Sequence, residues 1–158
     1  MESLNNLARK IIESNQYMTL GTSDANGSPW VSPVVYAHDK NWNLYFISIP
    51  ESRHCQNIKV NNRVAVAIFD SQQSVGEGVG LQIEGVVEKT SLKDAPLVTK
   101  LYFSRKYPHG RNIRSAFSSA LKKFLDGEIY RFYKFIPTKV WINDPNADRD
   151  VRVEVNLG

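Results

Sequence analysis

Hydrophobic residues near the N-terminus recur at helical spacing. Apolar side chains from Leu4 to Ile12 lie three or four positions apart, and Ser3 stands directly before them, where a hydroxyl can cap a first turn. The pattern predicts an amphipathic helix that begins after Ser3 and ends near Asn15.

Most of the following chain consists of short runs of β-branched and aromatic residues separated by turn residues, a pattern typical of strands. Asn26-Gly27 is typical of a tight hairpin turn. Pro33 lies inside one run and has no N–H to donate, so we expect that strand at a sheet edge or at a bulge. The predicted strands are residues 17–23, 29–37, 44–49, 63–70, 79–90, 128–136, 138–142 and 151–157.

Three further helices are expected between these strands. A short helix is predicted over residues 52–61. Another begins after Asp94, with Pro96 in its first turn, and is broken at residues 108–110. The last follows over residues 113–124 and stops before Gly127.

The order of these elements predicts the fold class. Strands follow one another as hairpins and do not alternate with crossover helices, so the sheet should be mainly antiparallel. A small barrel with helices packed on its outside is the natural way to close such a sheet. We therefore expect a mainly β (α+β) protein in which residues 1–158 form a single domain.

Composition indicates a folded chain in a reducing compartment. Hydrophobic residues make up 42% and charged residues 23%, which excludes a disordered chain. Cys55 is the single cysteine, so no internal disulfide can form. The longest apolar run, residues 64–69, is too short for a bilayer, and the first residues do not resemble a secretory signal. We expect a cytoplasmic protein without a membrane partner.

The net charge of +4 is unevenly distributed. Residues 89–139 contain 12 Lys and Arg against 3 Asp and Glu, whereas the rest of the chain contains 8 and 13. One alternative is therefore a non-enzymatic module that binds nucleic acid through this basic block, with Tyr102, Phe103 and Tyr107 stacking on bases. At helical spacing, core-facing aromatic residues beside solvated charges explain the same pattern, and we favour that interpretation over a nucleic-acid partner.

Standard motifs for metal and nucleotide sites are missing from the sequence. The three histidines are isolated, so no metal site is predicted. Gly76, Gly78 and Gly80 precede a strand, whereas a dinucleotide-binding motif follows one. Cys55 lies near a helix start, where a nucleophilic thiol is one interpretation and an inert buried thiol is the commoner one.

An anion pocket is predicted at the start of the 52–61 helix. Arg53 and His54 occupy its first turn, where the partial positive charge of a helix normally favours acidic residues. Free backbone N–H groups, the hydroxyls of Ser48 and Ser52 and these two side chains would together hold a phosphate. The alternative is that Ser52 is an ordinary N-cap and Arg53 is only solvated.

Several segments in this region resemble the pyridoxamine 5′-phosphate oxidase-like family in order and spacing, over roughly residues 17–90. They are DANGSPWVSPVV at residues 24–35, LYFIS at 44–48, SRH at 52–54, NI at 57–58, NNRV at 61–64 and LQIEGVVE at 81–88. The resemblance implies a split antiparallel β-barrel of Greek-key type with flanking helices. It also implies bound FMN and a homodimer with the flavin in the interface.

The resemblance assigns cofactor contacts residue by residue. Ser52, Arg53 and His54 match the family's phosphate motif, and Ser48 matches its threonine on the preceding strand. Trp30 is either a stacking neighbour of the flavin or a core or dimer-contact residue. Positions that match the lining of the flavin ring and ribityl chain are Val31, Ser32, Pro33, Val34 and Ile47.

Departures from the family pattern argue against pyridoxamine phosphate as substrate. Ser32 and Ala37 stand where the true oxidases have an arginine and a lysine, and His54 and Gly80 replace a lysine and a glutamine. The oxidases' C-terminal Trp and Arg signature has no counterpart in residues 141–158. Either the phosphate is held less tightly, or cations of the basic block replace the missing ones, namely Arg105, Lys106 and Arg111.

The sequence thus predicts an FMN-dependent oxidoreductase acting on an unidentified small molecule. No catalytic side chain is predicted, because the flavin itself carries the hydride or electrons. Within the same family, a deazaflavin or a haem liganded by His54 or His109 is an alternative cofactor. A dimeric scaffold or sensor without a cofactor also stays open.

Overall fold

The computed structural model describes residues 3–91, 93–106 and 130–158. The helix expected at residues 113–124 lies outside the described residues, as do Tyr107, His109 and Arg111. Of the basic block of residues 89–139, the structure describes residues 89–91, 93–106 and 130–139.

The N-terminal helix forms as predicted. Helix α1 (Leu4–Ser14) is preceded by Ser3, whose hydroxyl accepts a hydrogen bond from the backbone N–H of Asn6 at 3.3 Å. Its buried side chains are Ala8, Ile11 and Ile12, which belong to the apolar stripe seen in the sequence. The helix lies against β5, β6 and β8.

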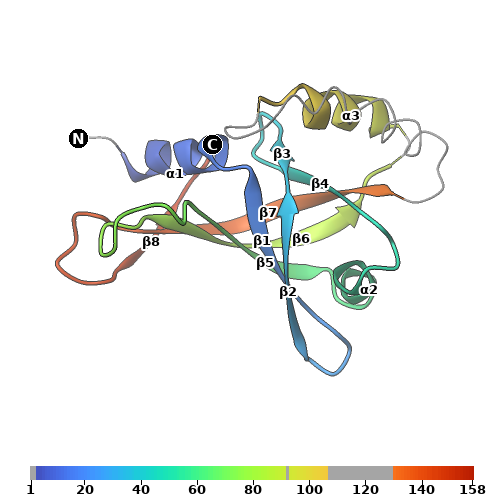
Figure 1. The fold of residues 1–158 in the computed structure, drawn as a ribbon, viewed down its shortest axis with the longest axis horizontal. Helices are drawn as coiled ribbons and strands as arrows, with labels where there is room; N and C mark the ends of the chain where they lie inside the picture. Colours follow the sequence, from blue (N-terminus) through green and yellow to red (C-terminus); the bar gives the residue numbers. More distant parts are fainter. Residues whose placement is uncertain (1–2, 92, 107–129) are drawn as a thin grey trace.

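The strands form one antiparallel sheet that curls into a half-barrel (Figure 1). The order is β2-β1-β5-β6-β7-β4-β3, with β8 paired to β7. This arrangement is the split barrel expected from the sequence. The strands are β1 (Tyr17–Ser23), β2 (Pro29–Val35), β3 (Ala37–His38), β4 (Leu44–Ser48), β5 (Arg63–Phe69), β6 (Gly80–Lys89), β7 (Arg131–Asn143) and β8 (Arg152–Val155).

The segment expected as one strand over residues 29–37 is divided at Tyr36. Residues before it form β2, which pairs with β1, and those after it form β3, which pairs with β4 at the opposite edge of the sheet. Tyr36 is completely buried, and its hydroxyl donates to the carbonyl of Ile12 at 2.6 Å. The buried Tyr36 side chain anchors the chain where it passes from β2 at one edge of the sheet to β3 at the other edge. Pro33 lies on an edge strand, as predicted.

The two strands expected at residues 128–136 and 138–142 are one strand, β7. Pro137 does not end it, because it lies opposite Gly85 where the register between β6 and β7 shifts after Glu84. Thr138 is the extra residue, and its hydroxyl donates to the Glu84 carbonyl at 3.1 Å. A proline is tolerated at such a bulge since the ladder is already interrupted there.

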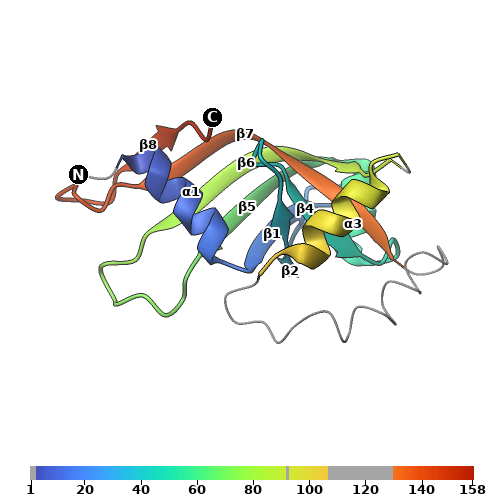
Figure 2. The ribbon, with the colours of Figure 1, turned by 90° about the horizontal axis from the view of Figure 1, so that it is seen from above.

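The other two described helices pack against different strands of the half-barrel. Helix α2 (Arg53–Val60) packs against β1 and β2, and helix α3 (Ala95–Ser104) packs against β3 and β4. Figure 2 shows α1 and α3 lying across the same side of the curled sheet. In the described ranges no helix is long and apolar enough to cross a membrane.

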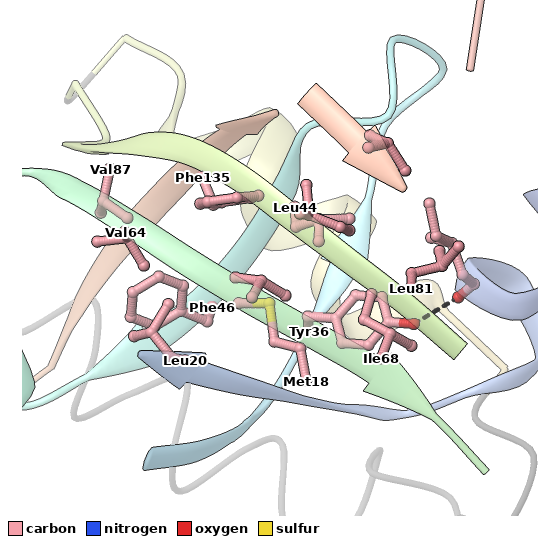
Figure 3. Close-up of a cluster of buried hydrophobic side chains, with 14 of the residues drawn as sticks. Met18, Leu20, Tyr36, Leu44, Phe46, Val64, Ile68, Leu81, Val87 and Phe135 are labelled. Atoms are coloured by element: carbon pink, nitrogen blue, oxygen red, sulfur yellow. Dashed lines mark hydrogen bonds between the residues drawn. The ribbon is translucent and has the colours of Figure 1, made fainter. Parts of the chain in front are cut away.

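The core fills the concave face of the sheet. Side chains from β1, β4, β5, β6 and β7 point toward one another around Tyr36 and Phe46 (Figure 3). The C-terminal residues close one end of it, since Arg9 of α1 donates to the Leu157 carbonyl at 2.9 Å. Fully buried large side chains include Phe46, Phe135, Met18, Leu20, Leu44, Ile68, Leu81 and Ile83.

Candidate functional site

The start of α2 is a helix N-terminus without a side-chain cap. Strand β4 ends at Ser48, and the Ser52 N–H donates to the Ile49 carbonyl at 3.0 Å in the turn that follows. Ser52 occupies the N-cap position, but its hydroxyl makes no capping hydrogen bond, and the first turn contains no acidic residue. The N–H groups of this turn therefore keep their partial positive charge available to an anion.

Three of the four residues predicted for the anion pocket converge on one point. His54 Nε2 lies 2.6 Å from Ser48 Oγ and 3.2 Å from Ser52 Oγ, and the two hydroxyl oxygens are 3.2 Å apart. Ser48 is buried, while Ser52 and His54 are half-buried. Two hydroxyls and an imidazole can reorient to donate hydrogen bonds to one oxyanion.

Arg53 turns away from this cluster toward β2. Its guanidinium carbon lies 4.3 Å from the centre of the Trp30 ring, a cation–π contact. The pKa of Asp24 is lowered, first by the Ser28 backbone N–H and in smaller part by the charge of Arg53. Arg53 forms no hydrogen bond or ion pair with any described residue, so its N–H donors remain free for a ligand at this end of the sheet.

The remaining predicted contacts lie along two facing strand edges. Strand β2 is an outer strand of the sheet, and β4 pairs with β3 only through Tyr45 and Leu44. No ladder joins β2 to β4 among the described residues, although the two strands lie in contact. Backbone N–H and C=O groups of both edges are therefore left for other partners.

Side chains on β2 alternate across this edge. Val31 and Pro33 are exposed, Ser32 is buried and Val34 is half-buried. On β4, Ile47 is half-buried beside the buried Ser48. The predicted residues thus lie along the border between β2 and β4, close to the part of the chain that leads into α2.

Cys55 adds a thiol that the sequence interpretation left undecided. Its side chain is only 1% exposed, and burial raises the pKa of the thiol. The neighbouring side chains of His54, Ser52, Tyr133 and Ser48 lower it by more, so that the pKa is about 7. Proximity to a helix N-terminus acts in the same direction.

Tyr133 is a neighbour of this site whose position local sequence patterns did not reveal. Tyr133 comes from β7 and reaches Cys55 only because β7 pairs with β4. Burial, followed by the interaction with Cys55, raises the pKa of the Tyr133 hydroxyl. A single sequence contains no signal for this long-range contact.

Arg105 does not lie free to complete the phosphate pocket. Its guanidinium donates to the carbonyls of Ile12 at 3.0 Å, Glu13 at 3.1 Å and Asn15 at 2.6 Å, and also to that of Tyr36. It therefore binds the C-terminal end of α1, where a cation is favoured. Arg111 lies outside the described residues.

Fold and site together define a split β-barrel with an anion-attracting cluster beside an open strand edge. The sequence matches the family model described as pyridoxamine 5′-phosphate oxidase over residues 4–133, so the chain belongs to this family. None of the curated proteins compared matches it.

Solved structures confirm the fold. A haem-binding protein from Mycobacterium smegmatis superimposes with a TM-score of 0.74 at 19% identity, covering 97% of this chain but only 58% of that protein. An FAD-binding protein from Mesorhizobium loti gives 0.65 at 20%, with 89% and 94% covered. A haem storage protein from Vibrio cholerae gives 0.62 at 16%, with 88% and 94% covered. These TM-scores establish a shared fold, and the names of the neighbours show that proteins with this fold bind different cofactors.

Proposed function

We propose that this protein binds FMN as a homodimer and acts as a flavin-dependent oxidoreductase on a small molecule other than pyridoxamine 5′-phosphate. The observation that carries the proposal is the convergence of Ser48, Ser52 and His54 at the uncapped N-terminus of α2. Family membership and a neighbour of the same fold named as FAD-binding support it.

The donors at this point suit the FMN phosphate. A dianionic phosphate would replace the mutual hydrogen bonds of the two hydroxyls and His54, and it would gain the first-turn N–H groups of α2. Arg53 lies next to this position with its donors unused by the described residues. Among the described residues, one guanidinium and one imidazole lie at this position, those of Arg53 and His54.

The open edge between β2 and β4 suits the rest of the cofactor. Unpaired backbone groups of β2 would hydrogen-bond to the ribityl chain and ring, and Val31, Pro33 and Ile47 would provide apolar contact. The bound flavin would supply the hydride or electron chemistry. The chain's own residues would orient it and exclude water, and a second subunit over the β2 edge would complete the enclosure.

Haem is the competing cofactor, because two structural neighbours are named as haem proteins. The position of His54 disfavours it as an axial ligand, since Nε2 is engaged by Ser48 at 2.6 Å and Ser52 at 3.2 Å. The visible spectrum of the purified protein distinguishes the two: flavin bands support the proposal, whereas a Soret band would replace it with a haem protein.

Comparison of FMN with riboflavin tests the phosphate contacts directly. The wild-type apoprotein should bind FMN at least about tenfold more tightly than riboflavin, because hydrogen bonds to a charged group each contribute about 1.5–3 kcal/mol. Arg53→Ala and Ser48→Ala should weaken FMN binding and leave riboflavin binding almost unchanged. Flavin fluorescence quenching gives both affinities.

Lys40→Ala is the matched control, since Lys40 is an exposed cation in the turn before β4. It should retain the preference for FMN. A colourless protein that takes up neither flavin, or an Arg53→Ala variant with the wild-type preference for FMN, would refute the proposed site.

A further inference from the structure

A cavity lies on the side of α2 that faces β6 and β7. Its volume is about 430 Å³, within the range of small-molecule sites. It is bordered by the β4–α2 turn, the buried face of α2 and the ends of two paired strands. Its polar lining consists of Glu51, Cys55, Lys59, Lys89, Arg131 and Tyr133.

Positive charge predominates around this cavity. Lys59 comes from the last turn of α2, Lys89 from the end of β6 and Arg131 from the start of β7, and Glu51 is the lining carboxylate. Lys59 and Lys89 form no hydrogen bond or ion pair with the described residues. Within the described part of the chain, the only hydrogen bond of the Arg131 side chain goes to the neighbouring Tyr130 carbonyl, at 2.8 Å. Like charges gathered at one cavity repel each other unless an anion lies among them.

Two buried polar side chains form the inner wall. Tyr133 is 5% exposed and Cys55 is 1% exposed, and both line the cavity. The Tyr133 hydroxyl and the Cys55 thiol lie within hydrogen-bonding reach of each other, and each shifts the other's pKa. The inner wall therefore presents a hydroxyl and a thiol to whatever occupies the cavity.

We propose that this cavity is a binding site for a small organic carboxylate, held by Lys59, Lys89 and Arg131 so that its neighbouring carbon atoms lie against the Cys55 thiol and the Tyr133 hydroxyl. The cavity adjoins the proposed FMN phosphate position, because the Cys55 thiol also lies within hydrogen-bonding reach of Ser48, Ser52 and His54. It places a reactive side chain of the protein beside a bound anion.

The single cysteine allows a direct test with two alkylating probes that are similar in size but differ in charge. Iodoacetate is a carboxylate and iodoacetamide is its neutral analogue. With either one, the Cys55 sulfur attacks the carbon that bears iodine, a C–S bond forms as the C–I bond breaks, iodide leaves and the thiol proton passes to solvent. Mass spectrometry of the intact chain counts the product, since Cys55 is the only thiol.

The measured quantity is the ratio of the iodoacetate rate to the iodoacetamide rate. We expect this ratio to be about tenfold higher in the native protein than in the same chain unfolded in urea, because a cavity lined by one sign of charge concentrates counter-ions. Lys89→Gln and Arg131→Gln should each lower the ratio, and Lys40→Gln should not. Added sodium chloride should also lower it in the wild type, which tests the charges without any substitution.

The proposal fails if the native ratio equals the unfolded ratio, if neither probe reaches Cys55 in the native protein, or if the two glutamine variants and salt leave the ratio unchanged. Flavin binding by the same preparation is measured separately from its spectrum. A protein that fails to bind FMN but shows the raised ratio would remove the proposed function and leave this site in place.

Discussion

Tyr36 is a completely buried phenol, and the guanidinium carbon of Arg105 lies 4.5 Å from the centre of its ring. Burial raises the pKa of Tyr36 from 10.0 to about 12, although the charge of Arg105 opposes the shift. The folded protein therefore keeps this proton in a pH range where the unfolded chain loses it.

The sign of the pH effect follows from this difference. The contribution of neutral Tyr36 to stability is fully present below pH 10 and is lost as the pH rises toward 12. A shift of two pKa units corresponds to about 2–3 kcal/mol. We expect urea unfolding to show a loss of this order above pH 10, and Tyr36→Phe to have a flatter pH dependence despite a lower stability at neutral pH.

Tyr17→Phe is the matched control, because Tyr17 is exposed at the start of β1. It should follow the wild-type curve of unfolding free energy against pH. Parallel curves for the wild type and Tyr36→Phe would show that Tyr36 does not carry the alkaline loss.

For individual residues, local spacing in the sequence predicted that Ser48, Ser52 and His54 lie together. It did not predict the contacts that their neighbours make with distant parts of the chain. Ser48, Ser52 and His54 are separated by one strand end and one turn, so their convergence follows from local geometry. The contact of Arg53 with Trp30 depends on how α2 packs on β2. The four carbonyls bound by Arg105 depend on tertiary packing, which no spacing rule predicts.

Strand β7 continues past Pro137 because the residue opposite it on β6, Gly85, has no side chain. A Cβ on Gly85 would lie 2.4 Å from the Ile136 carbonyl oxygen and 2.5 Å from Phe135 Cζ. Phe135 is completely buried, so neither neighbour can move away without disturbing the core. Glycine is therefore required here by close packing between β6 and β7.

Gly85→Ala is expected to lower the free energy of unfolding by about 3 kcal/mol, at the upper end of typical overpacking effects. Gly78→Ala is the control, since a Cβ at Gly78 meets nothing within 4 Å. It should change stability by less than about 0.5 kcal/mol, as surface substitutions do. Urea unfolding of both variants provides the comparison, and equal stabilities would contradict the steric account.

Hydrophobic periodicity and turn residues predicted most elements correctly, including α1, β1, α2, β5 and β6. The two errors have a common cause. The sequence pattern predicts two strands on either side of Pro137 where the structure has one, and one strand across Tyr36 where the structure has two. In both cases the strand boundaries depend on a partner strand, which local sequence does not specify. The partner is β6 with its Gly85 in the first case and β4 in the second.

At the scale of the whole molecule, two rows of small, uncharged residues lie in register on the outer face of β2, β1 and β5. Val31 pairs with Gly21, and Gly21 with Ala65, to form one row across the three strands. The next row consists of Pro33, Thr19 and Ala67. Small apolar side chains on an outward face allow close approach of another flat surface, and the proposed second subunit would cover this face.

Val31→Glu therefore tests the proposed dimer. Val31 is 59% exposed and lies on both this face and the border of the candidate cofactor site. A carboxylate buried there without a partner should weaken dimerisation on the order of 100-fold. Sedimentation velocity over a range of concentrations measures the dimer constant, and flavin fluorescence measures FMN affinity, which should fall in parallel if the cofactor lies in the interface.

Val60→Glu supplies the control, because Val60 is 64% exposed but lies at the far end of α2 from the cofactor border. It should leave both constants unchanged. A wild-type protein that is monomeric at all concentrations, or a Val31→Glu variant that dimerises as well as Val60→Glu does, would exclude this face as the interface. Loss of FMN affinity in Val31→Glu with an intact dimer would instead place the flavin on one subunit alone, since the substitution would then act only through the β2 border.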